Sequence, residues 1–448
     1  MAGSLLGDML ARISDTGRAL IGAEEPRPLI ERAEALMQAD GEATGTARAQ
    51  SLLDGYRTLS DEGRLDFLDA VADRFASDLA ALNRAISAYI EAPGPATART
   101  VHAASEPRSQ QLLRLMNRAP GGTRALVAMR EDLLAGLAAR PGLKGLDDDF
   151  RHLFASWFNR GFLELRRVDW QTPAAILEKI IDYEAVHAIQ GWRDLRRRVA
   201  APDRQLYGFF HPQLTDDPLI FVEIALTAEI PAAIGPILAE ERETLTPAQA
   251  TTAVFYSISN CQQGLRGISF GNFLIKQVVE ELRRDFPRLS TFVTLSPVPG
   301  FAAWLEREGI DHAALGREAV VESAGRGLED GAGIPGDGLD PDGQARAESA
   351  RDAALAALAA RYLTEAKRPD GSPLNPVARF HLGNGARLER VNPAADRSAR
   401  GLAESHGVMV NYLYDLRDIE KNHEAFAARS EVVQSAAVRR LARQAAAR

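Results

Sequence analysis

The stretch from Thr251 to Phe301 decides the fold, and its sequence is TTAVFYSISNCQQGLRGISFGNFLIKQVVEELRRDFPRLSTFVTLSPVPGF. Its first part, Val254 to Ser259, is rich in β-branched and aromatic residues, which predicts a half-buried strand. From Asn272 onward, large apolar residues recur every four positions, which predicts a helix. Thr291 to Leu295 then predicts a second strand. The order of strand, glycine-rich turn, helix and strand predicts a mixed α/β domain.

Three glycines, Gly264, Gly267 and Gly271, lie between the first predicted strand and the helix. Glycine adopts positive φ angles and lets a ligand approach the backbone closely. The first N–H groups of the following helix have no partner within the helix, and the helix dipole favours an anion there. A pyrophosphate binds well at such a place. The turn therefore predicts a site for an acyl-CoA or a nucleotide.

Two common phosphate-binding motifs are absent from this turn. The sequence contains no G-x-x-x-x-G-K-[ST], which argues against a P-loop NTPase, and no G-x-G-x-x-G follows the strand. Gly267-Ile268-Ser269-Phe270-Gly271 does form a G-x-S-x-G, the motif of the α/β-hydrolase nucleophile. That motif needs a sharp turn, whereas the last strand-like residue, Ser259, lies well before Ser269. A thioesterase or hydrolase that uses Ser269 as its nucleophile stays an alternative.

Three separated blocks of the sequence resemble the malonyl-CoA decarboxylase family. The first block is the opening stretch, through its FYSIS, QQGL, LSP and PGF residues. The second is NPVARFHLGNG, from Asn375 to Gly385, and the third is MVNYLY, from Met409 to Tyr414. Weaker similarity extends upstream through Trp157 to Trp192. The resemblance covers most of the chain, and three blocks in the same order are far more specific than a single motif.

The resemblance implies an α+β protein with two domains. An all-helical N-terminal domain, residues 1–157, precedes a GNAT acetyltransferase-like mixed α/β catalytic domain, residues 158–448. The resemblance also implies a carboxy-lyase of malonate and fatty acid metabolism, which converts malonyl-CoA to acetyl-CoA and carbon dioxide. It implies no metal, prosthetic group or other cofactor, because the CoA moiety belongs to the substrate.

The resemblance also assigns functional residues. The family's catalytic serine falls on Ser296, and its catalytic histidine falls on His381, which lies in a strand-like run. The residues that bind the CoA moiety fall on Arg266, Gly267, Ile268, Ser269, Phe270, Gly271 and Asn272. Ser269 stands where the acetyltransferase pattern has a glycine, which leaves open how many N–H groups contact the pyrophosphate. Tyr414 is a substrate-binding candidate, for which a core or stacking role is the alternative.

The chemistry of decarboxylation suits these residue types. Loss of carbon dioxide from a malonyl thioester leaves an enolate, with negative charge on the thioester oxygen. A hydrogen-bond donor directed at such an oxygen lowers the barrier by roughly 3–4 kcal/mol. Histidine, with an ordinary pKa of about 6.5, can then supply a proton. We therefore expect Ser296 to bind the malonyl group and His381 to orient its carboxylate or deliver the proton, and the sequence leaves that choice open.

Two other functions fit part of the same sequence. A thioesterase predicts that Ser269→Ala abolishes activity while Ser296→Ala does not. A non-catalytic acyl-CoA-binding protein on the same fold predicts CoA binding without turnover. An acetyltransferase is a further variant, which would need a pocket for an amine acceptor.

Composition sets the broad class of protein. At 448 residues we expect two or three domains, by the rule of about 100–200 residues each. The net charge of −8 argues against a nucleic-acid partner, and no apolar run approaches the ~20 residues that span a membrane. Eight histidines and the single cysteine, Cys261, are scattered without metal-ligand spacing. The frequent alanine and arginine suggest a bacterial, cytoplasmic protein.

Patterns outside the catalytic stretch predict further elements. An apolar stripe from Leu65 to Ile90 predicts a long helical segment, which prolines end, and the stripe could be buried against another subunit of a homo-oligomer. Thr172 and Pro173 predict the cap and first residue of another helix. The stretch 325–343 is rich in glycine, proline and acidic residues, which predicts a flexible insert, a lid or a linker. The remaining predictions are helices at 133–137, 150–158, 351–366 and 432–448, and a strand at 219–226.

Overall fold

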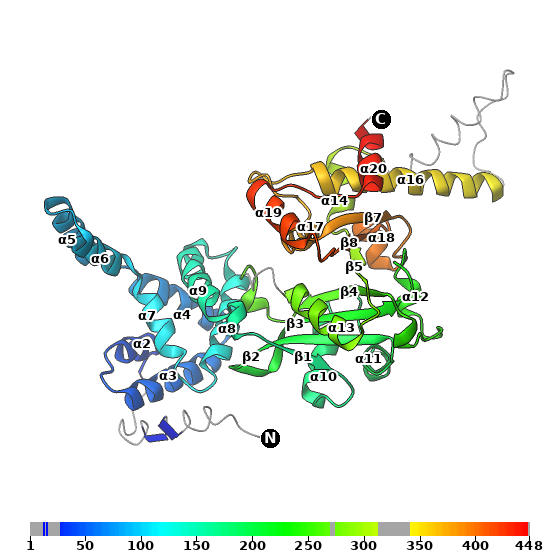
Figure 1. The fold of residues 1–448 in the computed structure, drawn as a ribbon. Coiled ribbons are helices and arrows are strands. Elements are labelled where there is room, and N and C mark those ends of the chain that lie inside the picture. Colours follow the sequence, from blue (N-terminus) through cyan, green and yellow to red (C-terminus); the bar gives the residue numbers. More distant parts are fainter. Residues whose placement is uncertain (1–11, 14, 17–26, 269–273, 312–340, 447–448) are drawn as a thin grey trace. The chain divides into compact units, whose positions relative to one another are not determined.

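The computed structural model describes residues 12–13, 15–16, 27–268, 274–311 and 341–446 (Figure 1). Four predicted CoA-binding residues, Ser269 to Asn272, lie outside the described residues, as does most of the predicted insert at 325–343. Chain contacts divide the protein into two compact units. The first unit comprises residues 1–164, 210–219 and 261–271, and the second comprises residues 165–209, 220–260 and 272–448.

The first unit is built mainly from helices. Its α-helices are α2 (Leu29–Met37), α3 (Glu42–Arg57), α4 (Asp61–Arg74), α5 (Leu79–Glu91), α6 (Pro95–Ser105), α7 (Arg108–Met116), α8 (Gly122–Gly136) and α9 (Lys144–Trp157). Fully buried side chains such as Leu52, Leu112 and Phe150 form its core. The helices predicted at 133–137 and 150–158 are confirmed within α8 and α9.

The long apolar stripe is divided between two helices. The chain leaves the helical conformation after α4, and Asp78 caps α5, because its side chain accepts a hydrogen bond from the Ala81 N–H at 2.9 Å. Leu79 and Ile90 on α5 are 69% and 71% exposed. The three-and-four spacing of apolar residues correctly predicted each of the two helices. The ends of the stripe on α5, however, are exposed to solvent in this unit. α5 lies beside α6 (Figure 1).

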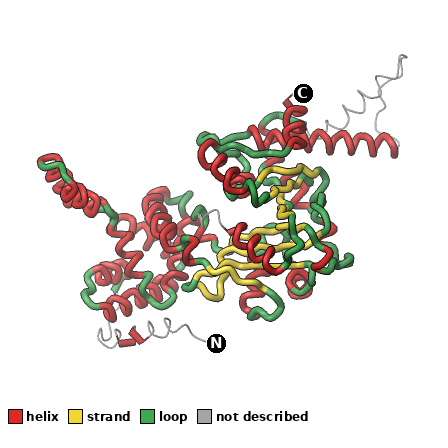
Figure 2. Tube along the Cα trace, in the orientation of Figure 1, coloured by secondary structure: helices red, strands yellow, loops and turns green. Residues whose placement is uncertain are grey.

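The second unit is built around a mixed sheet, drawn in yellow in Figure 2, which has eight strands in the described residues; the end of β2 and the start of β3 belong to the first unit. The strands are β1 (Glu164–Val168), β2 (Arg204–His211), β3 (Leu214–Thr227), β4 (Thr252–Asn260), β5 (Thr291–Thr294), β6 (Ser296–Pro297), β7 (Arg387–Asn392) and β8 (Met409–Leu413). Their order is β1-β2-β3-β4-β5-β8-β6, with β7 also pairing with β8. Strands β3 and β4 are antiparallel, whereas β4 and β5 are parallel. The three predicted strands are confirmed as β3, β4 and β5.

Helices join and flank these strands. They are α10 (Ala174–Tyr183), α11 (Trp192–Val199), α12 (Gly235–Leu238), α13 (Leu274–Asp285), α14 (Phe301–Arg307), α16 (Pro341–Glu365), α17 (Pro376–Gly383), α18 (Ala399–Ser405), α19 (Ile419–Arg429) and α20 (Ala436–Ala446). Helix α13 joins β4 to β5, as predicted, while α16 overlaps the helix predicted at 351–366 and α20 lies within the one predicted at 432–448. Thr172 does not cap α10, because its hydroxyl accepts from the Asp169 N–H at 3.0 Å.

Strands β4 and β5 separate after a short parallel ladder. Their pairing runs from Thr252 opposite Thr291 to Phe255 opposite Thr294, followed by a hydrogen bond from the Leu295 N–H to the Phe255 carbonyl at 3.0 Å. The next residues form β6, which pairs with β8 instead of β4. The far end of β4 is therefore open along this edge. Residues of β4 and of β6, on the two sides of this gap, line the candidate site.

The fold class predicted from the sequence, a helical N-terminal region followed by a mixed α/β region, is confirmed. No described helix combines the length and the apolar character that crossing a membrane requires.

Candidate active site

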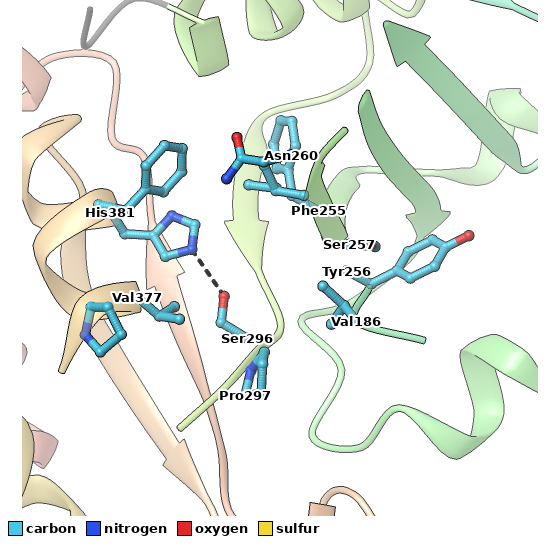
Figure 3. Close-up of a pocket in the computed structure, with 12 residues that line it drawn as sticks. Val186, Phe255, Tyr256, Ser257, Asn260, Ser296, Pro297, Val377 and His381 are labelled. Carbon is cyan, nitrogen blue, oxygen red and sulfur yellow. Dashed lines mark hydrogen bonds between the residues drawn. The ribbon is translucent and has the colours of Figure 1, made fainter. Parts of the chain in front are cut away.

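A cavity of about 260 Å³ lies in the second unit beside the open end of β4 (Figure 3). It is lined by Val186, Phe255, Tyr256, Ser257, Ile258, Asn260, Ser296, Pro297, Pro376, Val377, Phe380 and His381. Both predicted catalytic residues belong to this lining. Pockets that enclose a drug-sized ligand usually exceed about 300 Å³. This cavity is smaller than such pockets.

Ser296 is fixed by its position in β6. The strand pairs with β8, with Ser296 opposite Val410. The Ser296 hydroxyl donates to Oγ1 of Thr294 at 2.9 Å, and its oxygen lies 3.1 Å from Nε2 of His381. Figure 3 shows this second contact as a dashed line between the two side chains. Residues 85 positions apart in the chain are thus brought into hydrogen-bond contact.

His381 lies on helix α17, so the prediction of a strand there was wrong. The reason is the Asn375-Pro376 pair, which starts a helix. The Asn375 side chain accepts from the Ala378 N–H at 2.8 Å and donates to the Pro299 carbonyl at 2.9 Å. Pro376 occupies the first helical turn, where its missing N–H costs nothing. This cap ties the start of α17 to the turn that follows Ser296.

The other ring nitrogen of His381 contacts a tyrosine. Nδ1 lies 2.8 Å from the Tyr414 hydroxyl, and the Tyr412 ring stacks on the imidazole with centroids 4.6 Å apart. His381 is 2% exposed, and this burial lowers its pKa to about 3. The imidazole is therefore neutral near pH 7, and one of its nitrogens carries a hydrogen while the other accepts one.

The hydrogen bonds favour one tautomer. Because the Ser296 hydroxyl donates to Thr294, its oxygen is free to accept from an N–H at Nε2 of His381. Nδ1 is then the acceptor and receives the hydroxyl hydrogen of Tyr414. In the opposite tautomer, Tyr414 would accept from Nδ1 and its own hydrogen would need another acceptor. The consistent direction of donation therefore runs from Tyr414 through His381 and Ser296 to Thr294.

The wall opposite this pair contains the Ser257 hydroxyl, and the buried Glu184 carboxylate lies behind it. Ser257 lines the cavity and donates to the Glu184 carboxylate at 2.8 Å. That carboxylate also accepts from Ser259 at 3.1 Å and from the backbone N–H groups of Val186 and His187. None of the described residues that line the cavity carries a formal charge at neutral pH. The lining is thus apolar with a few neutral polar groups.

Three residues around the predicted catalytic pair were missed by the sequence analysis. Thr294 and Tyr412 reach the pair through the register of β5 and β8, which no local spacing reveals. Ser257 lay in the quoted FYSIS segment, and its position on a strand facing the predicted site was the available signal.

The predicted CoA turn is described in the first unit as far as Ile268. It begins with a 3₁₀ turn at Gln263–Leu265, and Gly267 has a φ of +80°. Only glycine adopts this backbone conformation readily, which agrees with the choice of residue. The assignment of Arg266, Gly267 and Ile268 to CoA binding stays a prediction. No described group of three or more histidine, cysteine or acidic side chains is arranged to hold a metal ion.

Comparison with known proteins gives the family. Residues 161–448 match the family model of the malonyl-CoA decarboxylase C-terminal domain, and residues 75–158 match that of the N-terminal domain. The chain is 40% identical over 344 residues to a mitochondrial malonyl-CoA decarboxylase of Anser anser anser, covering 71% of this chain and 66% of that protein. The corresponding protein of Rattus norvegicus is 40% identical over 332 residues, with 70% and 67% covered. The chain thus spans about two thirds of the length of these relatives.

Solved structures agree with this result. A malonyl-CoA decarboxylase from Rhodopseudomonas palustris is 54% identical, with a TM-score of 0.82 over 92% of this chain and 98% of that one. Another, from Agrobacterium vitis, is 51% identical, with a TM-score of 0.81 over 92% of this chain and 99% of that one. The family predicted from the three sequence blocks is confirmed, and the chain belongs to the malonyl-CoA decarboxylase family.

Proposed function

We propose that this chain is a carboxy-lyase that converts malonyl-CoA to acetyl-CoA and carbon dioxide. The observation that carries the proposal is the contact between Ser296 and His381 at 3.1 Å in a buried, uncharged cavity. Family membership supports the same reaction, since the names of the matched proteins specify malonyl-CoA decarboxylase. One proton is consumed in each turnover, because a malonyl carboxylate becomes neutral carbon dioxide and a methyl group.

The bond changes can be followed atom by atom. The bond between the carboxylate carbon and the methylene carbon breaks, and its electron pair moves toward the thioester oxygen. Carbon dioxide leaves, and an enolate remains. The methylene carbon then takes a proton and becomes the methyl group of acetyl-CoA. The protein must therefore stabilise charge on the thioester oxygen and supply one proton.

We assign these tasks to the two catalytic residues by their positions. The Ser296 hydroxyl lines the cavity, and when the malonyl group binds it turns from Thr294 to donate to the developing enolate, where such a donor is worth roughly 3–4 kcal/mol. His381 supplies the proton through its Nε2, directly or through the Ser296 hydroxyl 3.1 Å away. The enolate carbon is a strong base, so a neutral imidazole is sufficient as the donor, and solvent restores the proton after turnover. Tyr414 keeps the imidazole in the required tautomer.

The neutral lining contributes to the same reaction. A carboxylate that enters this cavity gives up water and meets no described cationic side chain on its walls. Charge moves from the carboxylate to the thioester oxygen as the bond breaks, so the surroundings favour the products of that step over the bound substrate. This scheme uses the side chains of the cavity and includes no cofactor.

The CoA moiety is assigned to the turn from Arg266 to Asn272, as the sequence predicts, and Tyr414 is assigned to the acyl end through His381. The thioesterase alternative is not favoured, because the family comparisons support a decarboxylase. A non-catalytic acyl-CoA binder is not favoured either, since the names of the matched proteins specify a decarboxylase.

We also propose that residues 1–157 form a domain through which the chain assembles into a homo-oligomer. Exposed apolar side chains on α5 support this proposal, since such residues are usually covered when a partner is present. They are Leu79, Ile86, Tyr89 and Ile90. A cytoplasmic location is retained as a prediction, while the vertebrate relatives are named mitochondrial.

Product analysis tests the proposed reaction. The purified protein is incubated with malonyl-CoA, and carbon dioxide, acetyl-CoA, free malonate and free CoA are each measured. We expect acetyl-CoA and carbon dioxide in equal amounts, loss of both in Ser296→Ala, and turnover in Ser269→Ala. Free malonate that disappears in Ser269→Ala would show a thioesterase and overturn the proposal.

A further inference from the structure

We infer that Arg130, on helix α8 of the first unit, positions residues 264–267, which belong to the described part of the turn proposed to bind CoA. The inference deepens the proposed function and rests on it. Arg130 Nη1 donates to the Gly264 carbonyl at 2.6 Å and to the Arg266 carbonyl at 3.0 Å. Both carbonyls belong to the turn predicted to bind CoA, and both residues lie in the same compact unit as Arg130. A helix with no chemistry of its own thus holds the substrate-binding backbone.

The Arg130 side chain is buried and engaged in hydrogen bonds to an acidic residue and to the turn. Its side chain is 1% exposed, and its Nε donates to Asp147 on α9 at 2.9 Å. Burying a guanidinium is costly unless its charge is paired and its N–H groups find acceptors. Asp147 supplies the opposite charge, and the carbonyls of Gly264 and Arg266 supply further acceptors. The buried charge is therefore stable only while the turn keeps its position against α8.

The contact with Arg266 determines where the next N–H points. The peptide between Arg266 and Gly267 is trans and planar, so its N–H points opposite to its carbonyl. Since the carbonyl is directed at Arg130, the Gly267 N–H is directed away from α8. Gly267 then turns the chain with a φ of +80°. The neighbouring Arg266 and Ile268 N–H groups donate to the Gln263 and Leu265 carbonyls. An outward N–H beside a positive-φ glycine is typical of anion-binding turns.

A second contact shows how closely the turn is pressed against α8. A Cβ atom added to Gly264 would lie 1.9 Å from the carbonyl oxygen of Val127, which is backbone and cannot rotate away. Val127 and Arg130 are three residues apart and thus share one face of the helix. Gly264 is therefore required by close approach, and any larger residue there would push the turn off the helix.

The same helix also holds the strand next to the turn. Arg124 pairs with Asp217 of β3 at 2.5 Å, and nearby Leu219 accepts a hydrogen bond from the Cys261 N–H at 2.9 Å. The start of the turn is thus tied to α8 indirectly, and its middle is tied directly through Arg130. All of these residues belong to the first unit.

The test compares two substrates in the variant Arg130→Met. Malonyl-CoA carries the pyrophosphate, whereas malonyl-pantetheine is the same thioester ending before it. We expect KM for malonyl-CoA to rise about 10–100-fold, the range for losing hydrogen bonds to a charged group, with kcat changed less than about threefold. With malonyl-pantetheine, kcat/KM should stay within about threefold of the wild type. A structural role alone would lower activity on both substrates equally.

Two further variants keep the inference testable if Arg130→Met folds poorly. Gly264→Ala displaces the turn but keeps the Arg130 side chain and its ion pair with Asp147, and it should reproduce the substrate-dependent loss. Tyr56→Phe is the matched control, since it removes a hydrogen bond to Asp132 within the same helical unit but none to the turn. It should leave the ratio of kcat/KM for the two substrates unchanged.

Failure of the inference and failure of the proposed function give different results. Equal losses on both substrates, or an unchanged KM for malonyl-CoA, in Arg130→Met and Gly264→Ala would overturn the inference. Absence of carbon dioxide release by the wild type would instead overturn the proposed function. Calorimetric titration with CoA itself still decides the inference in that case, with weaker binding expected in both variants and unchanged binding contradicting it.

Discussion

The cavity around Ser296 and the turn on helix α8 are built in opposite ways. In the cavity, side chains make the contacts, and Tyr414, His381, Ser296 and Thr294 donate in sequence from one to the next. In the turn, backbone groups make the contacts, and one buried arginine holds two carbonyls. Under the proposed function, the chemistry therefore depends on particular side chains, whereas binding of the CoA phosphates depends on the backbone conformation of the turn. Changes in the first region should affect kcat, and changes in the second should affect KM.

The largest effect should come from removing either member of the catalytic pair. In Ser296→Ala the donor to the enolate is lost, and in His381→Gln the proton donor is lost. General acid–base catalysis and oxyanion stabilisation are each worth about 10²–10⁴-fold, so kcat should fall by that factor. KM for malonyl-CoA should change little, because the turn is intact. Steady-state kinetics with both variants measures this, and a raised KM at unchanged kcat would place these residues in binding instead.

Burial of His381 should also appear as a pH dependence of stability. Its pKa is lowered from the ordinary 6.5 to about 3, so between these values the unfolded chain binds a proton that the folded protein does not. The free energy of unfolding is therefore unaffected by this group above about pH 6.5, and it decreases as the pH falls from 6.5 toward 3. The slope is up to about 1.4 kcal/mol per pH unit.

Urea unfolding of the wild type and His381→Gln between pH 4 and 6 measures this slope. The variant should lose less stability on acidification. His187, whose pKa burial lowers to about 4, acts with the same sign in both proteins and cancels in the comparison. Parallel stability curves for the two proteins would contradict the neutral, buried state of His381. The turn on α8 contains no such titrating group in its described part.

Tyr414→Phe should give a smaller loss of activity. The hydroxyl that donates to Nδ1 disappears, so the imidazole is free to adopt the tautomer without a hydrogen at Nε2. We expect kcat to fall about tenfold, the value of one hydrogen bond of roughly 1.4 kcal/mol, at unchanged KM. Steady-state kinetics provides the activity, and nitrogen NMR of the labelled histidine reports the tautomer.

Tyr412→Phe is the control for this change. Its ring stacks on the same imidazole, but its buried hydroxyl has no hydrogen-bond partner among the described residues. Activity should stay within about twofold, because the stacking ring remains and no hydrogen bond is lost. Equal losses in Tyr412→Phe and Tyr414→Phe would mean that ring packing rather than the hydroxyl contact supports His381.

The smallest effect should come from Tyr56→Phe in the helical unit. This change removes the hydrogen bond to Asp132, which is 2.9 Å long and partly buried. The free energy of unfolding should decrease by about 1 kcal/mol. Neither kcat nor KM should change, since Tyr56 belongs to neither of the two regions compared. Chemical denaturation gives the free energy, and a kinetic defect in this variant would mean that helix packing reaches the active site.

Sequence and structure agree best where backbone shape matters. The glycines of the turn were visible because positive φ and close approach leave a residue signature, and Gly264 and Gly267 have those properties here. Ser296 and His381 were found only because blocks of sequence resembled a family, since a contact across 85 residues has no local signal. His381 was expected on a strand because the short apolar run is ambiguous, although the Asn375-Pro376 pair is a helix start signal.

Contacts that depend on tertiary structure could not be predicted from the sequence. An arginine on an amphipathic helix normally faces solvent, so nothing in the sequence marked Arg130 as buried against a turn 134 residues later. The positions of Thr294 and Tyr412 around His381 follow from strand register, which one sequence does not determine. The apolar spacing of α4 and α5 looked continuous because the same period continues on both sides of the Asp78 cap.

A double-mutant cycle on Ser296 and His381 tests whether these two residues act as one unit in the chemical step, apart from the binding of CoA. Activity is measured for Ser296→Ala, His381→Gln and the combined variant with malonyl-CoA at saturation. We predict that the combined variant is about as slow as the slower single variant, as expected for residues that act together. Losses that multiply in the combined variant would show that the residues act independently and would contradict the account.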